Sequence, residues 1–206
     1  QNPKKPIALS FEAGVGKVFK EDMMKLVMAF KRELQKVFQS EDYERQKMLI
    51  MHDFEEQQND MLDEIHETAA KYDFTVRNIE TGFSFLPMVN GQPVEEEDYG
   101  ALSEDVQDII EKNSQLMQEK VGLILRGMQA LEKECDQKII ELNRKVGIFA
   151  IGRYVQEILD TYKNYERAVM YIKAVREDIL EHLNQFMEPE ETQEDIMASL
   201  LPVFGK

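Results

Sequence analysis

The sequence predicts a mainly α-helical protein with a helical base, a long antiparallel coiled-coil arm and a small β-hairpin at the arm tip. Two long segments carry this prediction: residues 41–72 contain neither proline nor glycine, and residues 103–146 contain no proline. In both, apolar side chains recur at alternating three- and four-residue steps, the pattern of a helical seam. Between them, residues 74–89 are rich in aromatic side chains, follow a period of two and are bounded by turn residues, which is typical of a hairpin.

Residues 1–40 are expected to form an N-terminal strand around residues 7–11, a turn at Gly14-Val15-Gly16, and the first base helix from Glu21 to Phe38. Ser40 is expected to cap the next helix. The apolar positions on one face of the first helix are Met23, Leu26, Val27, Phe30, Leu34, Val37 and Phe38.

Residues 41–146 are expected to form the arm. Its first helix, over residues 41–72, would be about 45–50 Å long at 1.5 Å per residue. The hairpin would occupy about residues 74–89, and Asn90-Gly91 would supply a second tight turn. Ser103 would begin the returning helix. Glycines within and beyond it are expected to permit close approach or bends: Gly122, Gly127, Gly147 and Gly152.

Residues 147–206 are expected to complete the base with further helices. Their apolar side chains recur at helical spacing over residues 154–183. A last short helix is predicted from Ile196 to Leu201, after Pro189.

Composition excludes several classes of partner. The chain has 206 residues, with 25 Lys and Arg against 40 Asp and Glu, for a net charge of -15. This charge repels nucleic-acid phosphates and anionic membrane surfaces, so neither is an expected partner. One cysteine and 12 methionines favour a reducing, cytoplasmic location. Because the chain starts at Gln1 and stops just after an apolar run, we expect it to be part of a longer protein.

Two motifs come close to binding sites and fail on spacing. Gly14-Val15-Gly16-Lys17 resembles a phosphate loop, but Phe11 stands where that motif needs glycine and Val18 where it needs a hydroxyl. The segment that begins at His66 resembles a zinc-protease helix, but the second histidine is replaced by Ala70.

Three further groups are expected to be structural. The acidic run Glu95–Asp98 lacks the glycine and spaced ligands of a calcium loop, and Asp53 is expected to be a solvated helix residue. Acidic neighbours should raise the pKa of Cys135, which favours an unreactive thiol. The sequence thus gives no catalytic residue, no cofactor site and no metal site, and catalysis by this chain alone is not expected.

A series of short motifs runs along the chain, and Glu12 departs from it by standing where proline is usual. The motifs are Asn2-Pro3, Ala13-Gly14-Val15-Gly16 and Asp22-Met23 near the start, Gly82-Phe83 and Gly91-Gln92-Pro93 around the hairpin, and Leu131–Glu134, Val175–Glu181 and Phe186 later. The series resembles the helical insertion of Lon-like ATP-dependent proteases, in the bacterial group related to Lon-B. The resemblance implies a nucleotide-binding loop before Gln1, a serine-lysine protease domain after Lys206, and ATP and Mg²⁺ in the parent protein. No catalytic residue carries over.

We therefore expect a non-catalytic segment of an ATP-dependent serine endopeptidase that forms a homo-oligomer. It would contribute to engagement of unfolded or damaged protein substrates, to ring assembly, or to both. The expected substrate contacts at the hairpin are Phe83, Phe85, Leu86 and Met88, and the expected pore-proximal loop is Phe11, Gly14, Val15 and Gly16. One alternative is a coiled-coil scaffold or adaptor unrelated to proteolysis, and another is a small enzyme with its site between base and arm.

Overall fold

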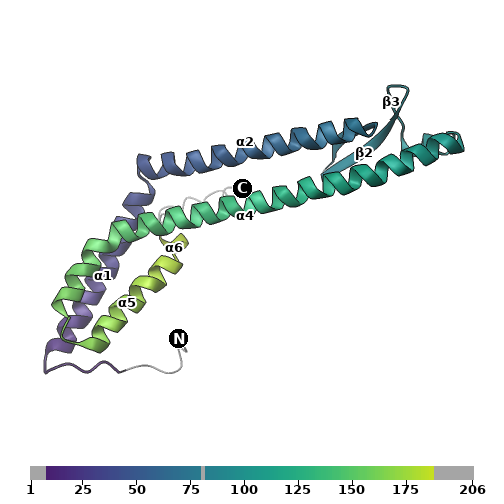
Figure 1. The fold of residues 1–206 in the computed structure, drawn as a ribbon. Helices are drawn as coiled ribbons and strands as arrows, with labels where there is room; N and C mark the ends of the chain where they lie inside the picture. The colour runs from purple at the N-terminus through teal and green to yellow at the C-terminus, as the bar shows by residue number, and fades with distance from the viewer. Residues whose placement is uncertain (1–7, 80–81, 188–206) are drawn as a thin grey trace, which may run out of the picture. The chain divides into compact units, whose positions relative to one another are not determined.

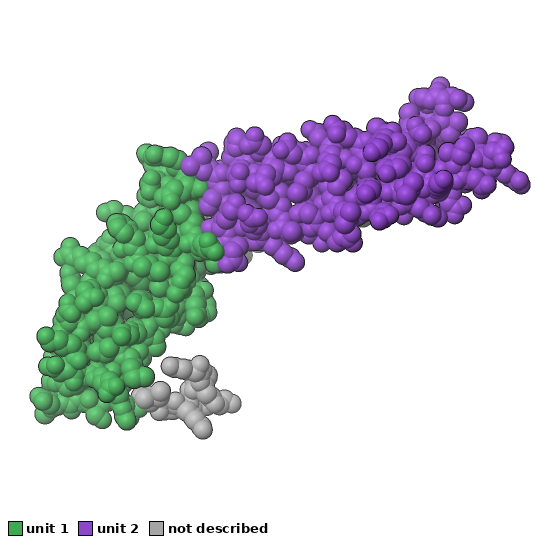
Figure 2. All heavy atoms as spheres, in the orientation of Figure 1, with its two compact units in different colours: residues 1–47, 140–206 green, residues 48–139 purple. Residues whose placement is uncertain are grey.

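The computed structural model describes residues 8–79 and 82–187 (Figure 1). It confirms the predicted fold class, with long helices packed antiparallel and a small three-stranded antiparallel sheet. The chain divides into two compact units (Figure 2). Unit 1 comprises residues 1–47 and 140–206, and unit 2 comprises residues 48–139. Two helices contribute to both units, α2 (Glu41–Lys71) and α4 (Glu104–Thr161).

Helix α1 (Val15–Phe38) begins at Val15, not at the predicted Glu21. The predicted turn is wrong at Val15 and Gly16, which already lie in the first helical turn. Gly14 directly precedes α1 and has a φ of 88°, a left-handed conformation that glycine adopts without steric cost. The earlier start places Phe19 on the buried face of α1. None of residues 8–14 lies in a strand, and Ile7 lies outside the described residues.

Unit 1 is built on the apolar stripe of α1. Most of the predicted stripe is buried, but Val27 is 40% exposed. Helix α1 packs against α6 (Asn184–Met187), and its Phe19 contacts Tyr162 just after α4 and Tyr171 on α5 (Glu166–Glu181). The buried side chains beyond α1 include Leu142, Ile151, Val155, Ile158, Tyr162, Ile172, Ile179 and Leu183. The helix predicted from Ile196 to Leu201 lies outside the described residues.

Helix α4 continues through Gly147 and Gly152 without interruption. A Cβ atom on Gly147 would lie 3.1 Å from Leu183 and 3.2 Å from Leu180, so the glycine permits close packing in unit 1. In unit 2, a Cβ added to Gly127 would lie 3.4 Å from the Met61 methyl group, which is an ordinary van der Waals distance. Of the four glycines predicted to permit close approach, Gly147 is the one where the structure confirms it.

The break between α1 and α2 is stabilised by Ser40, as predicted. The Tyr43 amide donates to Ser40 Oγ at 3.3 Å, and that hydroxyl donates to the carbonyl oxygen of Val37 at 2.6 Å. The Tyr43 hydroxyl in turn donates to Asn143 Oδ1 at 2.8 Å. The cap thus fixes the start of α2 and joins it to α4 within unit 1.

Unit 2 places a small sheet against two antiparallel helices (Figure 1). Strands β1 (Phe74–Ile79), β2 (Gly82–Val89) and β3 (Gln92–Pro93) pair antiparallel in that order. The predicted hairpin is confirmed, and so is the turn at Asn90-Gly91, whose φ angles of 54° and 80° suit a two-residue hairpin loop. Helix α3 (Glu96–Tyr99) follows.

The core of unit 2 is a small cluster where the sheet meets the helices. Side chains from β1 and β2 and part-buried methionines pack against it, and Leu131 and Cys135 extend the helical seam. The six buried residues that form the cluster are Ile65, Ala69, Phe74, Met117, Val121 and Ile124. No helix in the described parts of the chain is long and apolar enough to cross a membrane.

Candidate functional site

A cleft in unit 2 lies between β2, the segment around α3, and α4, with a volume of about 590 Å³. Its walls combine two kinds of surface. The apolar part includes Phe85, Leu86, Pro87, Val94 and Ile110, and the polar part includes Glu95, Glu96, Glu111, Ser114 and Gln118. A mixed cleft of this kind suits a ligand that has both apolar and polar groups.

Beside this cleft, strand β2 has a backbone edge that no strand among residues 8–79 and 82–187 pairs with. On one side β2 pairs with β1 along its length, whereas on the other side β3 pairs only with Met88 and Val89. The Met88 amide donates to Asp73 on the β1 side, and the Pro87 carbonyl accepts from Val94 on the opposite side. Because backbone groups alternate along an antiparallel strand, those of Phe83 and Phe85 point away from β1.

The four predicted contact residues on β2 lie in three environments. Phe83 and Phe85 pack against the core cluster of unit 2, so their rings anchor the sheet to the helices. Leu86 lines the cleft, and Met88 lines a second cavity of about 260 Å³. All four are half-buried. The structure brings Phe85 and Leu86 together at the cleft and separates Met88 from them.

The acidic side chains at the cleft are not equivalent. Arg77 on β1 donates to Glu95 at 2.6 Å, and this hydrogen bond lowers the pKa of the Glu95 carboxyl and raises the pKa of Arg77. The negative charge of Glu95 is therefore neutralised by Arg77. Glu96 and Glu111 also line the cleft, and they add negative charge to it.

A hydrogen-bonded link holds the end of α3 to the start of α4. Gln107 Nε2 donates to the carbonyl oxygens of Tyr99 at 3.0 Å and Leu102 at 3.1 Å, and the Tyr99 hydroxyl donates to the Gln107 carbonyl at 3.3 Å. Sequence analysis missed Tyr99 and Arg77 as parts of this site. The arginine and its partner are 18 residues apart, so no local signal could have paired them.

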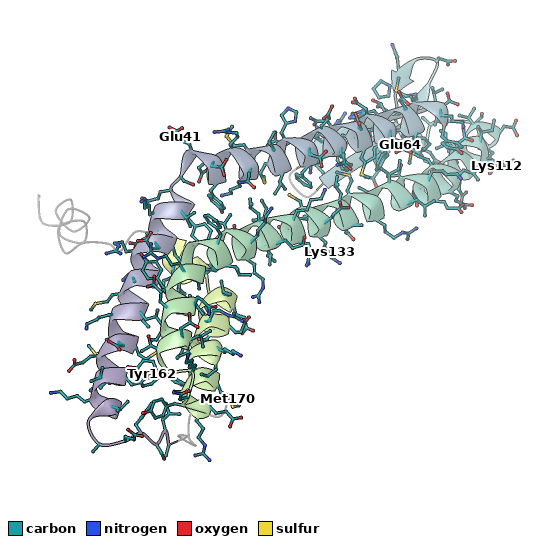
Figure 3. All side chains as sticks on the ribbon, turned by 60° about the vertical axis from the view of Figure 1, so that its left-hand side comes forward. Glu41, Glu64, Lys112, Lys133, Tyr162 and Met170 are labelled. Atoms are coloured by element: carbon teal, nitrogen blue, oxygen red, sulfur yellow. The ribbon has the colours of Figure 1, made fainter. Side chains whose placement is uncertain are left out.

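The predicted N-terminal loop lies in unit 1, where Phe11 joins an aromatic cluster. Its ring centroid is 4.9 Å from that of Phe19 and 5.2 Å from that of Tyr165. Tyr162, labelled in Figure 3, completes the cluster, and its hydroxyl donates to Asp22 at 2.8 Å. Phe11 also lies against Gly16, where an added Cβ would be 3.5 Å from the ring. A pore-proximal role for this loop stays a prediction.

Other groups weighed as chemical sites are dispersed. His52, His66 and His182 are exposed helix residues or caps. Within residues 8–79 and 82–187, no group of three His, Cys, Asp or Glu side chains is arranged to hold a metal ion. Cys135 is buried, and its pKa is raised chiefly by burial and further by Asp136, as predicted. Asp53 is an exposed residue of α2 that lies 3.5 Å from Lys138.

The N-terminal sequence has a counterpart among known families. The Lon-like LonC helical domain matches residues 1–26. The match covers the N-terminal segment and the first half of α1, and the later motifs of the resemblance lie outside it. The likeness is thus to a Lon-like helical domain over residues 1–26, and the finer assignment to the Lon-B-related group stays a prediction. Comparison with curated proteins gave no significant match, and comparison with solved structures gave none either.

Proposed function

We propose that this chain is a non-catalytic helical segment of a Lon-like ATP-dependent serine protease, and that the cleft beside β2 holds extended segments of unfolded client proteins. The family match over residues 1–26 supports the protease context. The unpaired edge of β2 next to a mixed apolar and acidic cleft carries the proposed role.

An unpaired strand edge binds an extended peptide mainly through backbone hydrogen bonds, which are independent of sequence. Phe83 and Phe85 direct their backbone groups toward that side. Leu86 and Ile110 would contact apolar side chains of the bound segment, while Glu96 and Glu111 would favour basic ones. Unfolded proteins offer all of these groups, so the site tolerates many clients.

The segment would hold a client while other parts of the parent protein supply the chemistry. ATP and Mg²⁺ would bind elsewhere in the parent, because Val18 stands in place of the required hydroxyl and Phe11, in place of glycine, is packed among aromatic rings. The expected context is a cytoplasmic homo-oligomer whose partners are unfolded or damaged proteins and the other domains of the parent chain. The charge of -15 makes nucleic acid and membranes unsuitable partners.

The most direct test compares Phe85→Pro with Phe85→Ala in this chain. Both variants lose the ring, but only proline also lacks the backbone donor that strand addition requires. Pro87 already occupies an equivalent outward position, so an edge proline is compatible with β2. Fluorescence anisotropy with labelled casein should show binding about tenfold weaker for proline than for alanine, the cost of one unmade hydrogen bond. Equal affinities would rule out strand addition.

A second test addresses the parent protease. Residues 41–146 are replaced by a short linker, and ATP-dependent degradation of casein is measured together with basal ATPase activity and oligomer size. Loss of degradation with the other two properties intact would support a role in client handling. Unchanged degradation would contradict it, and loss of the oligomer would assign the segment to ring assembly.

A coiled-coil scaffold is the second candidate, and one observation favours it. Ile109, Leu116 and Leu123 lie seven residues apart on α4 and are 60%, 42% and 54% exposed. Such a stripe suits a partner helix. It spans only two heptads, whereas sustained pairing usually needs three or four. Light scattering would decide: an oligomer of this chain that Leu116→Glu and Leu123→Glu dissociate would favour the scaffold.

A further inference from the structure

Unit 1 carries a second, separate surface on α1 and α5. A groove of about 560 Å³ is lined almost entirely by apolar side chains. Met24 and Met28 on α1 are 54% and 69% exposed, and Tyr171 on α5 forms part of the opposite wall. Large apolar side chains gathered at one exposed place usually mark a contact surface. Methionine side chains adapt readily to the shape of what covers them.

The charge of α1 is opposite to that of the whole chain. Helix α1 contains six basic and three acidic residues, whereas the chain has a net charge of -15. Lys20 lines the groove, and Lys17 is exposed one helical turn before it. A partner that fits this surface therefore combines apolar side chains with negative charge.

The last part of this chain has that composition. Residues 188–206 lie outside the described residues, and their sequence begins with an acidic stretch over residues 188–195 that has five acidic and no basic side chains. An apolar stretch follows at once in the sequence. The apolar residues are Ile196, Met197, Leu200, Leu201, Val203 and Phe204.

The length of the connection is sufficient. Helix α6 ends at Met187 and packs against α1. Even the last residue of α1, Phe38, is only about 15 Å along the helix axis from Met28, at 1.5 Å per residue. Residues 188–195 span up to roughly 26 Å when extended. The apolar stretch can therefore reach the groove.

We propose that residues 196–204 of this chain pack into the groove between α1 and α5, with the acidic residues 188–195 beside Lys17 and Lys20. A second copy of the chain is a poorer occupant through this face, because pairing two α1 helices would bring two net positive surfaces together. The intramolecular partner also needs no translational entropy to be lost on binding.

The test follows the methionine methyl groups of the 206-residue chain by NMR. Met24 and Met28 report on the groove, while Met48 in unit 2 and Met170 on α5 are exposed reference residues outside the groove lining (Met170 is labelled in Figure 3). In a chain that ends at Met187, the Met24 and Met28 signals should shift and the reference signals should stay. Peroxide should also oxidise Met24 and Met28 faster, at rates that approach those of Met48.

Because the shortened chain could misfold, a point variant tests the proposal in a chain of full length. Leu200→Asp should reproduce the shifts, whereas the matched control Ser199→Asp, which adds a charge without removing an apolar side chain, should not. Identical Met24 and Met28 signals in the full and shortened chains would overturn the proposal. So would protection of Met24 that appears only as protein concentration rises, because that result would assign the groove to a second copy. Protection that appears only within the full-length parent protein would assign it to a neighbouring domain.

Discussion

The two units are similar in size but very different in how much they bury. Among the residues that the structure describes, seventeen apolar side chains are buried in unit 1 and eight in unit 2. Unit 1 stacks helices around aromatic and branched side chains. Unit 2 has a seam between two helices and a cluster of six buried residues beside the sheet. A helical pair with so thin a core leaves much of its surface free for partners.

The difference indicates where stability and recognition reside. Local stability follows the density of buried apolar contacts, so unit 1 should open less often than unit 2. The unpaired strand edge and the cleft both lie in unit 2, close to the buried cluster beside the sheet. The part of the sheet that would bind a client therefore packs against buried side chains, and the less densely packed seam between the helices lies elsewhere in the unit.

The largest expected effect comes from matched leucine truncations in the two units. Leu34 in unit 1 is fully buried, whereas Leu131 in the seam of unit 2 is 8% exposed. Leu34→Ala should lower the free energy of unfolding by about 4–5 kcal/mol and Leu131→Ala by about 2–3 kcal/mol, because a thin seam collapses around a cavity more easily. Urea denaturation followed by circular dichroism measures both, and equal losses would remove the contrast between the units.

An alkaline titration tests the comparison through Tyr162, a buried residue of unit 1. Burial, and then the hydrogen bond to Asp22, raise the pKa of Tyr162 to about 12. A raised pKa stabilises the folded state fully below the unfolded value of about 10, and this contribution is lost as pH rises through about 12. The contribution is on the order of 2 kcal/mol. In Tyr162→Phe, the corresponding loss of stability between these pH values should be absent. Tyrosinate absorbance that rises in one step near pH 10 for all tyrosines would contradict the assignment.

Two glycines on α4 provide a smaller, matched contrast. In unit 2 nothing lies within 4 Å of a Cβ added to Gly122, so Gly122→Ala should raise the free energy of unfolding by about 0.5–1 kcal/mol. In unit 1, Leu180 and Leu183 are buried and cannot move aside, so Gly147→Ala should lower it by about 1 kcal/mol. Thermal unfolding of the two variants tests the signs of these two changes in the free energy of unfolding. Stabilisation by both would show that the packing around Gly147 can accommodate a methyl group.

The smallest expected effect lies at the cleft. Arg77 lowers the pKa of Glu95, so the pair stabilises the fold above the unfolded pKa and loses this contribution as pH falls through the folded pKa. Both side chains are about half exposed, where ion pairs add little to stability. Glu95→Gln should therefore leave the unfolding midpoint unchanged at neutral pH. A clear fall in the midpoint would mean that the cleft is part of the stabilising core.

Periodicity and caps were sufficient to predict most of the helices and the hairpin. Ser40 marked the break between α1 and α2, and Asn90-Gly91 marked the turn after β2. The start of α1 was missed because two glycines suggested a turn, although only Gly14 has a positive φ. Phe19 was consequently left off the predicted core.

The candidate site was only partly predictable. Phe85 and Leu86 stood out as apolar residues on a strand, and both line the cleft. The unpaired edge depends on how short β3 is, and the neutralised Glu95 depends on a contact with Arg77 in another strand. Such features arise from tertiary packing and have no period or spacing in the sequence.

The unpaired edge of β2 also bears on solubility. An edge that accepts a client strand offers the same backbone groups to another molecule of this protein, and such edges seed aggregation unless something discourages it. Glu96 and Glu111 stand beside this edge, so two copies that approached edge to edge would bring like charges together. Turbidity that develops at neutral pH in a Glu96→Gln, Glu111→Gln variant, but not in the unchanged protein, would show that these two carboxylates keep the protein dispersed.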